Sequence, residues 1–353
     1  MRAARPILYC AALLGVFVIE NPQCGSYRVS HTHLAQLYLH DGLYDQALAE
    51  TRRAIRQEGP SAQRLLIASL AHIGIDQVDN ALDLLGQAID LEPNNSDLYA
   101  LVRDICQREE RFATMEEILA HLLLKHPENA WLWATQGWLF AHQQRPEEAI
   151  DALRKAINLD ADHLFAHIEL SRLLIAKEHF AEAEATLIAA LSSQPDDPQL
   201  LLVLGNCQLR QGLYAQADST FEKALATKAI EAVDIARIYY QNRQADRTIE
   251  YYERALAQNP DDPLILNNLA WTYAEAGLRL HYALNLSIRA IKLEATSPVY
   301  LDTYAELLLL TGRPSHAIAV MGQALALEPA DGEHRIYLEG QMAKFRQALA
   351  EHQ

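Results

Sequence analysis

The sequence predicts an all-α fold, a solenoid in which about nine helix pairs stack in single file. The main observation is an apolar residue, almost always alanine, that recurs at Ala54, Ala88, Leu122, Ala156, Ala190, Ala224, Ala255, Ala290 and Ala324. Successive members are 34 residues apart, except for one step of 31 and one of 35. Seven residues before each stands a second small residue, with Met115 and Thr248 replacing alanine. A fixed period of this length is the signature of a helical repeat array.

Residues 130–163 show what one repeat requires. Apolar and small side chains follow at spacings of three and four from Trp133 to Phe140, and again after Pro146, so two helices joined by a short turn are expected. Small residues such as Gly137 and Ala149 let the two helix axes approach closely, and larger side chains fill the space beside them. The unit is therefore a pair of antiparallel helices.

Breaker residues divide the chain at the same period. A proline ends the second helix of many repeats, five residues after the recurring position, at Pro93, Pro127, Pro195, Pro260 and Pro329. A glycine suited to the left-handed conformation stands in several inner turns, at Gly42, Gly212, Gly277 and Gly312. The predicted repeats are 28–61, 62–95, 96–129, 130–163, 164–197, 198–228, 229–262, 263–297 and 298–331. The 31-residue step predicts a shortened link between Ala224 and Ile230.

The first 26 residues do not fit the repeat. Two arginines precede an apolar stretch of 13 residues, 7–19, which has the length of a signal-peptide core and is short for a membrane span. We expect residues 1–26 to be a signal peptide or an N-terminal anchor, with the chain exported to the periplasm or tethered to the membrane through residues 7–19. The alternative is a cytoplasmic chain whose apolar first helix packs on the end of the solenoid. Neither Cys10 nor Cys24 follows a good lipobox.

Residues 332–353 are predicted to form a C-terminal capping helix. Apolar residues recur along this segment, as at Leu338, Met342 and Phe345. The last repeat of a solenoid leaves one face uncovered, and a helix with a polar outer side covers it. The alternative is a docking helix for a partner.

Composition and motifs exclude several classes of function. A formal net charge of −16 argues against a nucleic-acid partner, because phosphate binding requires a basic surface. His163 and His167 are four residues apart, a usable metal spacing, but His163 falls in an inter-repeat turn, so no metal site or cofactor is expected. Cys106 and Cys207 are about three repeats apart and are expected to be buried thiols. No set of groups converges as catalysis requires, and no enzymatic activity is expected.

The repeat pattern resembles that of the tetratricopeptide repeat. The resemblance covers about 300 residues and shows well in the sixth repeat, at Leu201, Leu204, Gly205, Ala217, Phe221 and Ala224. It implies a right-handed superhelix whose first helices line a concave groove. Members that clamp a terminal carboxylate carry lysine at the fifth position of a repeat, where this chain has Leu202 and Asn267, so that activity is not expected.

The same resemblance implies which side chains face the groove. They occupy the second, fifth, ninth and twelfth positions of each repeat. The candidate binding residues are Trp131, Trp138, Phe165, Ile168, Arg172, Leu202, Asn206, Arg237, Tyr240, Asn267 and Trp271. Exposed aromatic and arginine side chains are enriched at binding hot spots. Trp131, Trp138 and Phe165 are expected to form an aromatic patch, unless the two tryptophans bury themselves against the next repeat.

The expected function is that of a scaffold or adaptor. It would bind a peptide or helix of a protein partner in the concave groove, in a complex of the cell envelope. The alternative is a permanent structural subunit that docks through its convex face and termini. An enzyme is the least favoured class. The sequence names neither the partner nor the oligomeric state.

Overall fold

A computed structural model describes residues 30–329, 331–332 and 334–351. These residues form nineteen α-helices and no strand, as the all-α prediction requires. The chain divides into two compact modules, the N-terminal module ending at Ser193 and the C-terminal module beginning at Gln194. The predicted signal peptide or anchor at 1–26 lies outside the described residues.

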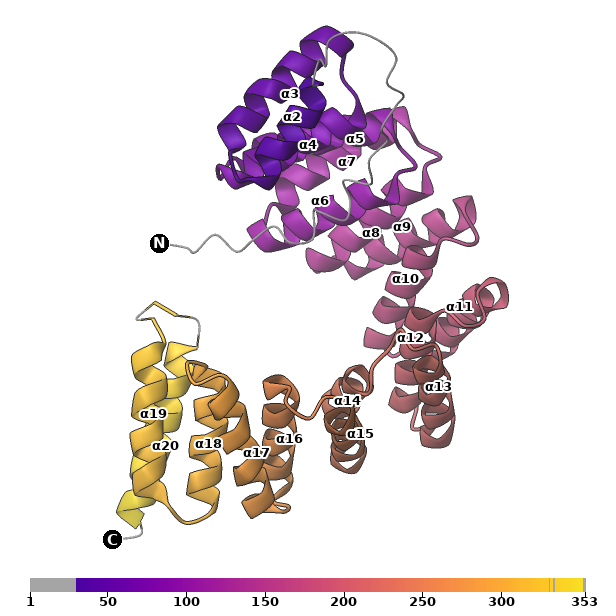
Figure 1. Cartoon of the computed structure of the whole chain (residues 1–353). Coiled ribbons are helices and arrows are strands. Elements are labelled where there is room, and N and C mark those ends of the chain that lie inside the picture. The colour runs from indigo at the N-terminus through magenta and orange to yellow at the C-terminus, as the bar shows by residue number, and fades with distance from the viewer. Residues whose placement is uncertain (1–29, 330, 333, 352–353) are drawn as a thin grey trace. The chain divides into compact units, whose positions relative to one another are not determined.

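The N-terminal module consists of five helix pairs, one in each of the first five predicted repeats. Short turns join the two helices of a pair, which lie side by side (Figure 1). The pairs are α2 (His31–His40) with α3 (Tyr44–Glu58), α4 (Ala62–Gly74) with α5 (Val78–Leu91), α6 (Ser96–Glu109) with α7 (Phe112–Lys125), α8 (Ala130–His142) with α9 (Pro146–Leu159), and α10 (Leu164–Ala176) with α11 (Phe180–Ser193).

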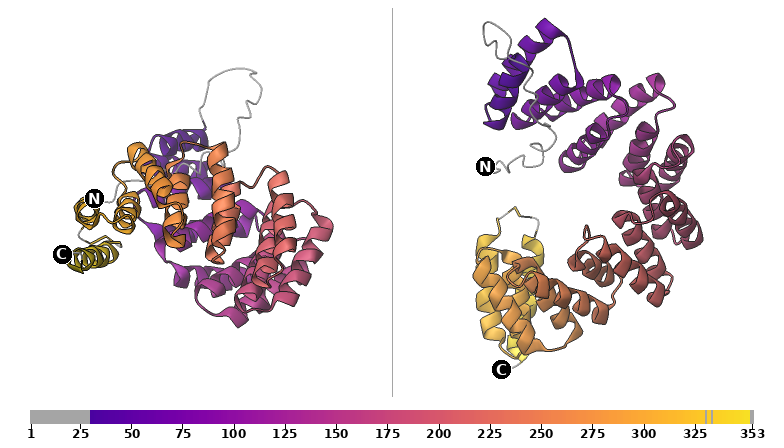
Figure 2. Two further views of the ribbon diagram at one scale, coloured as in Figure 1. Left: turned by 90° about the horizontal axis from the view of Figure 1, so that it is seen from below. Right: turned by 45° about the vertical axis from the view of Figure 1, so that its right-hand side comes forward.

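The C-terminal module has four pairs and a closing helix. The pairs are α12 (Pro198–Arg210) with α13 (Tyr214–Ala226), α14 (Ala232–Gln241) with α15 (Ala245–Gln258), α16 (Pro263–Ala276) with α17 (Leu280–Leu293), and α18 (Pro298–Leu310) with α19 (Pro314–Leu327). The closing helix is α20 (Arg335–Glu351), which packs beside α19 and buries Leu338, Met342 and Phe345 (Figure 2). An apolar stripe on α20 thus packs against the last helix pair.

The recurring small residues are the closest contacts of each pair. All eighteen positions of the two series, from Ala47 and Ala54 to Ala317 and Ala324, are at most 4% exposed. Gly137 on α8 shows how little room there is, because a Cβ atom there would lie 2.5 Å from Leu153 Cγ on α9. The period read from the sequence is therefore the period of helix contact, since only small side chains fit where two axes approach.

The inner turns share one backbone conformation. Each of the nine turns contains a residue with positive φ, at Gly42, Asp76, Glu110, Gln144, Glu178, Gly212, Arg243, Gly277 and Gly312. The sequence indicates this conformation only at the four glycines. The other five residues adopt it although their side chains disfavour it. The turn between α16 and α17 contains a second residue with positive φ, Arg279.

The shortened link predicted between Ala224 and Ile230 is wrong. Residues 227–231 leave five residues between α13 and α14, one more than residues 160–163 leave between α9 and α10. The missing length comes from α14, which has 10 residues where α12 has 13.

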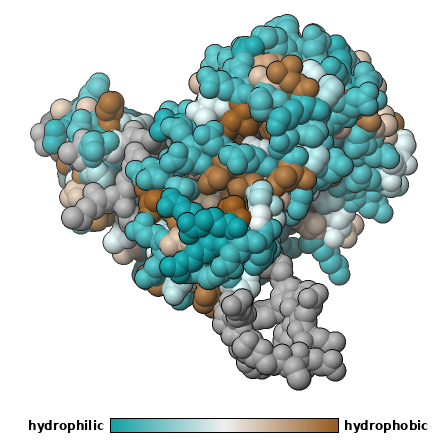
Figure 3. All heavy atoms as spheres, turned by 90° about the horizontal axis from the view of Figure 1, so that it is seen from above, coloured by the Kyte–Doolittle hydropathy of each residue, from teal (hydrophilic) through white to brown (hydrophobic). Residues whose placement is uncertain are grey.

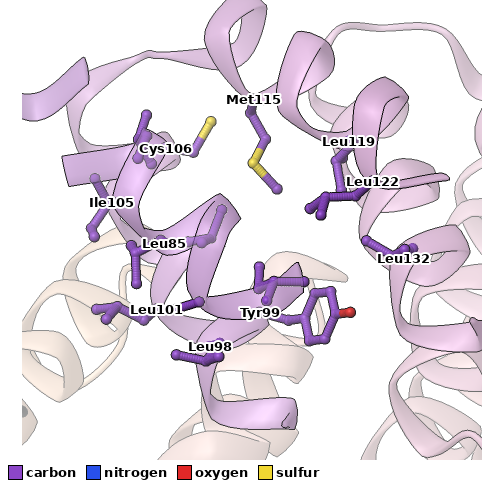
Figure 4. Close-up of a cluster of buried hydrophobic side chains, with 14 of the residues drawn as sticks. Leu85, Leu98, Tyr99, Leu101, Ile105, Cys106, Met115, Leu119, Leu122 and Leu132 are labelled. Carbon is purple, nitrogen blue, oxygen red and sulfur yellow. The ribbon is translucent and has the colours of Figure 1, made fainter. Parts of the chain in front are cut away.

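Continuous apolar packing runs through α4 to α8 in the N-terminal module. Figure 4 shows a part of this core, in which Leu85, Tyr99, Cys106, Met115 and Leu132 from successive helices gather. The Cys106 thiol is fully buried, and burial raises its pKa to about 11, so it acts as an apolar side chain, as expected. Polar side chains cover most of the outer face visible in Figure 3, with apolar ones in small patches.

Candidate functional site

A cavity of about 500 Å³ opens along the first helices of the C-terminal module. The helices α14, α15, α16, α18 and α20 all contribute side chains to its wall. The lining residues are Arg237, Tyr240, Gln241, Tyr252, Asn267, Asn268, Trp271, Thr272, Pro298, Val299, Asp302, Thr303, His334, Tyr337 and Leu338. Its volume is within the range of small-ligand sites, and it lies on the side where the first helices are expected to bind.

Aromatic side chains from neighbouring repeats form one wall. Trp271 Nε1 donates a hydrogen bond to the Tyr240 hydroxyl over 2.9 Å, which fixes the two side chains relative to each other. Tyr240 is exposed, Trp271 is half-buried, and Tyr252 is buried behind them. The wall therefore offers apolar ring surface that a ligand can contact without a large rearrangement.

Asp302 is a buried carboxylate in the wall formed by α18. It is 7% exposed, and Tyr337 on α20 donates a hydrogen bond from its hydroxyl to Asp302 Oδ2 over 3.2 Å. Burial is the largest influence on the pKa of Asp302 and raises it to about 6. The charge of Glu306 also raises this pKa, whereas the Tyr337 hydrogen bond and the charge of Lys344 lower it. Lys344 Nζ itself lies 2.8 Å from both carboxylate oxygens of Glu306.

Asn267 lies at the equivalent position of the preceding repeat. It is 4% exposed, and its Oδ1 has no hydrogen-bond partner among the described residues. Asp302 Oδ1 also lacks one. Most buried polar atoms in proteins are paired, so two unpaired acceptors beside one cavity are an unusual feature.

Four of the predicted groove residues meet at this cavity: Arg237, Tyr240, Asn267 and Trp271. Arg237 is exposed, but its guanidinium is 2.6 Å from Asp234 Oδ1 on the same helix, so its charge is compensated.

Two other predicted residues of this module do not line the cavity. Leu202 is half-buried on α12, and Asn206 Oδ1 accepts a hydrogen bond from Asn242 Nδ2 over 3.1 Å.

The aromatic patch expected in the N-terminal module is largely buried, which corrects that expectation. Trp138 is only 6% exposed, and its ring packs against His142 and Phe112, with ring centroids 4.2 Å and 6.4 Å away. Ile168 is buried as well. A position facing the groove in one repeat can thus be covered by a neighbouring one. Arg172 is exposed but lies 2.7 Å from Glu169.

Trp131 and Phe165 are half-buried and pack against the apolar core of the N-terminal module. Trp131 stacks on Tyr99 at a centroid distance of 5.9 Å, and the Arg103 guanidinium lies 3.9 Å from the centre of the Phe165 ring. Burial lowers the pKa of Arg103 to about 10, although the nearby Glu169 charge raises it. Both rings therefore form contacts between neighbouring repeats.

His163 and His167, whose spacing would suit a metal site, both form hydrogen bonds with backbone groups. His163 Nδ1 accepts a hydrogen bond from the Ala166 amide over 3.3 Å and so caps α10, while His167 Nε2 lies 2.8 Å from the Ala161 carbonyl. No group of three histidine, cysteine or acidic side chains that could hold a metal ion is found in the described part of the chain. Each helix in that part is too short or too polar to cross a membrane.

The candidate site also contains residues that the prediction missed. Asp302 occupies the fifth position of its repeat, 35 residues after Asn267, so the register places it in the groove, but it was not among the candidate binding residues. Tyr337 and His334 belong to the segment assigned to the cap, and no periodicity links them to the groove.

Two known proteins with similar sequences are longer than this chain. The BBSome complex member BBS4 homolog of Drosophila melanogaster is 25% identical over 250 residues, which are 68% of this chain and 51% of that protein. A peroxisomal targeting signal receptor of Yarrowia lipolytica is 27% identical over 165 residues, 43% of this chain and 27% of the receptor. The chain thus spans about half of the first relative and a quarter of the second.

Among solved structures, the Cut9–Hcn1 hetero-tetramer of APC/C shares 14% sequence identity with this chain. The alignment covers 88% of this chain and 74% of that one with a TM-score of 0.47, and so low a score supports no functional comparison.

Models of one repeat family match both modules. Five family models of the tetratricopeptide repeat match the sequence, at residues 29–53, 140–201, 200–231, 233–262 and 251–284. The matched stretches coincide with helix pairs whose small residues are buried at the expected period. Residues 29–53, 140–231 and 233–284 of this chain therefore consist of tetratricopeptide repeats.

Proposed function

We propose that this chain is an adaptor that holds a partner protein by binding a peptide or short helix of it along α14, α16 and α18. Stacked repeats of this kind present extended surfaces for protein–protein interaction. The observation that carries the proposal is the cavity beside Trp271, where rings from successive first helices remain accessible. The names of the two relatives, a complex member and a targeting signal receptor, fit a protein that acts by binding. We expect no enzymatic activity.

Site-specific photocrosslinking in the cells that make the protein tests this proposal. A photoreactive residue replaces Val299, which lines the cavity and is 51% exposed, and in a second variant it replaces Leu293, which is 50% exposed at the end of α17. We expect a discrete adduct with one protein from position 299 only, lost when Trp271→Ala is added. The same adducts from both positions, or an adduct unaffected by Trp271→Ala, would contradict cavity binding.

The cell-envelope location is part of the proposal and is supported by the sequence of residues 1–26. An apolar stretch of this length behind two arginines is typical of an export signal. N-terminal sequencing of the purified chain tests it: a mature chain beginning after residue 26, or a full-length chain recovered with membranes, supports export or tethering. A full-length chain in the soluble cytoplasmic fraction contradicts both.

Exposed apolar side chains away from the cavity favour the second candidate, a permanent structural subunit. Leu124 at the end of α7 and Ile336 at the start of α20 are among the most exposed large apolar side chains of the described residues. They lie on a second helix and at the terminal helix, where a subunit docking through its convex face and termini would make contact. Native mass measurement separates the two: a subunit of this kind aggregates when isolated, and an adaptor does not.

A further inference from the structure

We propose that the cavity recognises a basic side chain, lysine or arginine, of the bound peptide, with Asp302 and Asn267 accepting its N–H groups. This inference rests on the proposed function, because it names the chemistry of the ligand at the same site. Its basis is the pair of buried, unpaired acceptor oxygens, Asn267 Oδ1 and Asp302 Oδ1, beside one cavity.

The unpaired oxygens indicate a ligand that donates hydrogen bonds. A buried acceptor without a donor destabilises the structure, and a donor supplied by a ligand removes that penalty on binding. Both residues are more than nine-tenths buried, so bulk water does not solvate them freely. The carboxylate of Asp302 can turn about its terminal torsion, which is broad, and so present either oxygen to the cavity.

The electrostatics indicate that the donor is a cation. Within the described residues, Asp302 accepts a side-chain hydrogen bond only from the neutral Tyr337 hydroxyl. Lys344 is held by Glu306, and Arg237 by Asp234. A lysine or arginine from a partner would provide the counter-charge that Asp302 lacks, whereas an acidic side chain would be repelled.

The aromatic wall suits the stem of such a side chain. Lysine and arginine bury their methylene groups along apolar surface while their charged ends reach polar groups, and their cations are attracted to aromatic faces. Trp271 and Tyr240 offer that surface, while Leu264 and Val299 are exposed at the second positions of α16 and α18. We therefore expect apolar residues next to the basic one. This preference is opposite in charge to that of a groove that clamps a carboxylate.

A matched peptide series tests the inference on the full chain. The probes are acetylated and amidated peptides Ala-Leu-X-Leu-Ala, in which X is lysine, norleucine, arginine, citrulline or glutamate. Norleucine and citrulline keep the shape of lysine and arginine and remove the charge. Binding is followed by the chemical shift of the Trp271 indole N–H. We expect the lysine or the arginine peptide to bind about tenfold or more tightly than its neutral counterpart, and the glutamate peptide to bind least.

Two variants assign the effect to the carboxylate. Asp302→Asn removes the charge with little change in shape, and we expect it to abolish the preference for the basic peptide while binding of the norleucine peptide stays unchanged. Asp261→Asn makes the same change at a side chain that is 82% exposed and lies away from the cavity, and it should keep the preference.

Three results would overturn the inference. They are equal binding of charged and neutral peptides, a preference for glutamate, or failure of the whole series to bind. None of these results contradicts the proposed function, which is tested separately by photocrosslinking from position 299.

Discussion

Replacing Asp302 with asparagine should stabilise the C-terminal module above pH 6. The pKa of this carboxyl is raised from 3.8 to about 6 by burial, so its ionised form is unfavourable in the folded state. The folded state therefore gains stability at low pH and loses it as pH rises from 3.8 through 6. At about 1.4 kcal/mol per pKa unit, the loss at pH 7 amounts to about 3 kcal/mol. Asparagine cannot ionise, so the variant does not lose this stability.

Hydrogen exchange measured by mass spectrometry on peptides from α18 provides the assay. Opening free energies are compared between wild type and Asp302→Asn from pH 4 to pH 8, after correction for intrinsic exchange. The difference should be near zero at pH 4 and should grow to about 3 kcal/mol at pH 7. His334→Gln, which changes another side chain that lines the same cavity, should leave this difference unchanged. A difference that does not vary with pH, or a less stable variant, would refute the reasoning.

Three further predictions concern packing and turns. Burial lowers the pKa of His163, so its stabilisation is present above pH 6.5 and is lost as pH falls. The opening free energy of α10, corrected for intrinsic exchange, should fall on acidification in wild type but less in His163→Asn. Gln144 has a φ of 59°, which glycine adopts without strain, so Gln144→Gly should raise the free energy of unfolding in urea by about 1 kcal/mol. A decrease would show that the turn is not strained at this residue. Gly137→Ala should lower it by about 1–3 kcal/mol because of the contact with Leu153, whereas Gly340→Ala, with no neighbour within 4 Å, should not.

The periodic parts of this fold could be predicted from the sequence, because each repeat contacts its neighbours in the same way. The burial of Ala149 and Ala156 follows from their place in the period, and so does the pairing of the helices around them. The left-handed turns were visible only where glycine occurs, since a residue such as Gln144 carries no signal for a conformation that its neighbours impose on it.

Only part of the site could be predicted from the sequence, because the exposure of a side chain depends on residues outside its own repeat. Trp138 occupies a groove position, yet Phe112 from the previous repeat and His142 cover it. Tyr240, by contrast, is exposed, and Trp271, which donates a hydrogen bond to it, is half-buried. The contribution of Tyr337 comes from a segment without the repeat pattern, so no register could relate it to Asp302.

The closing helix α20 has a consequence for how this protein can change during evolution. Repeat arrays grow by duplication of whole units, and in most of them an added unit leaves existing sites intact. Here a copy of α18 and α19 inserted ahead of α20 would move Tyr337 and His334 one step away from Asp302 and open that side of the cavity. The number of repeats between Asn267 and the C-terminal helix is thus constrained by recognition as well as by folding.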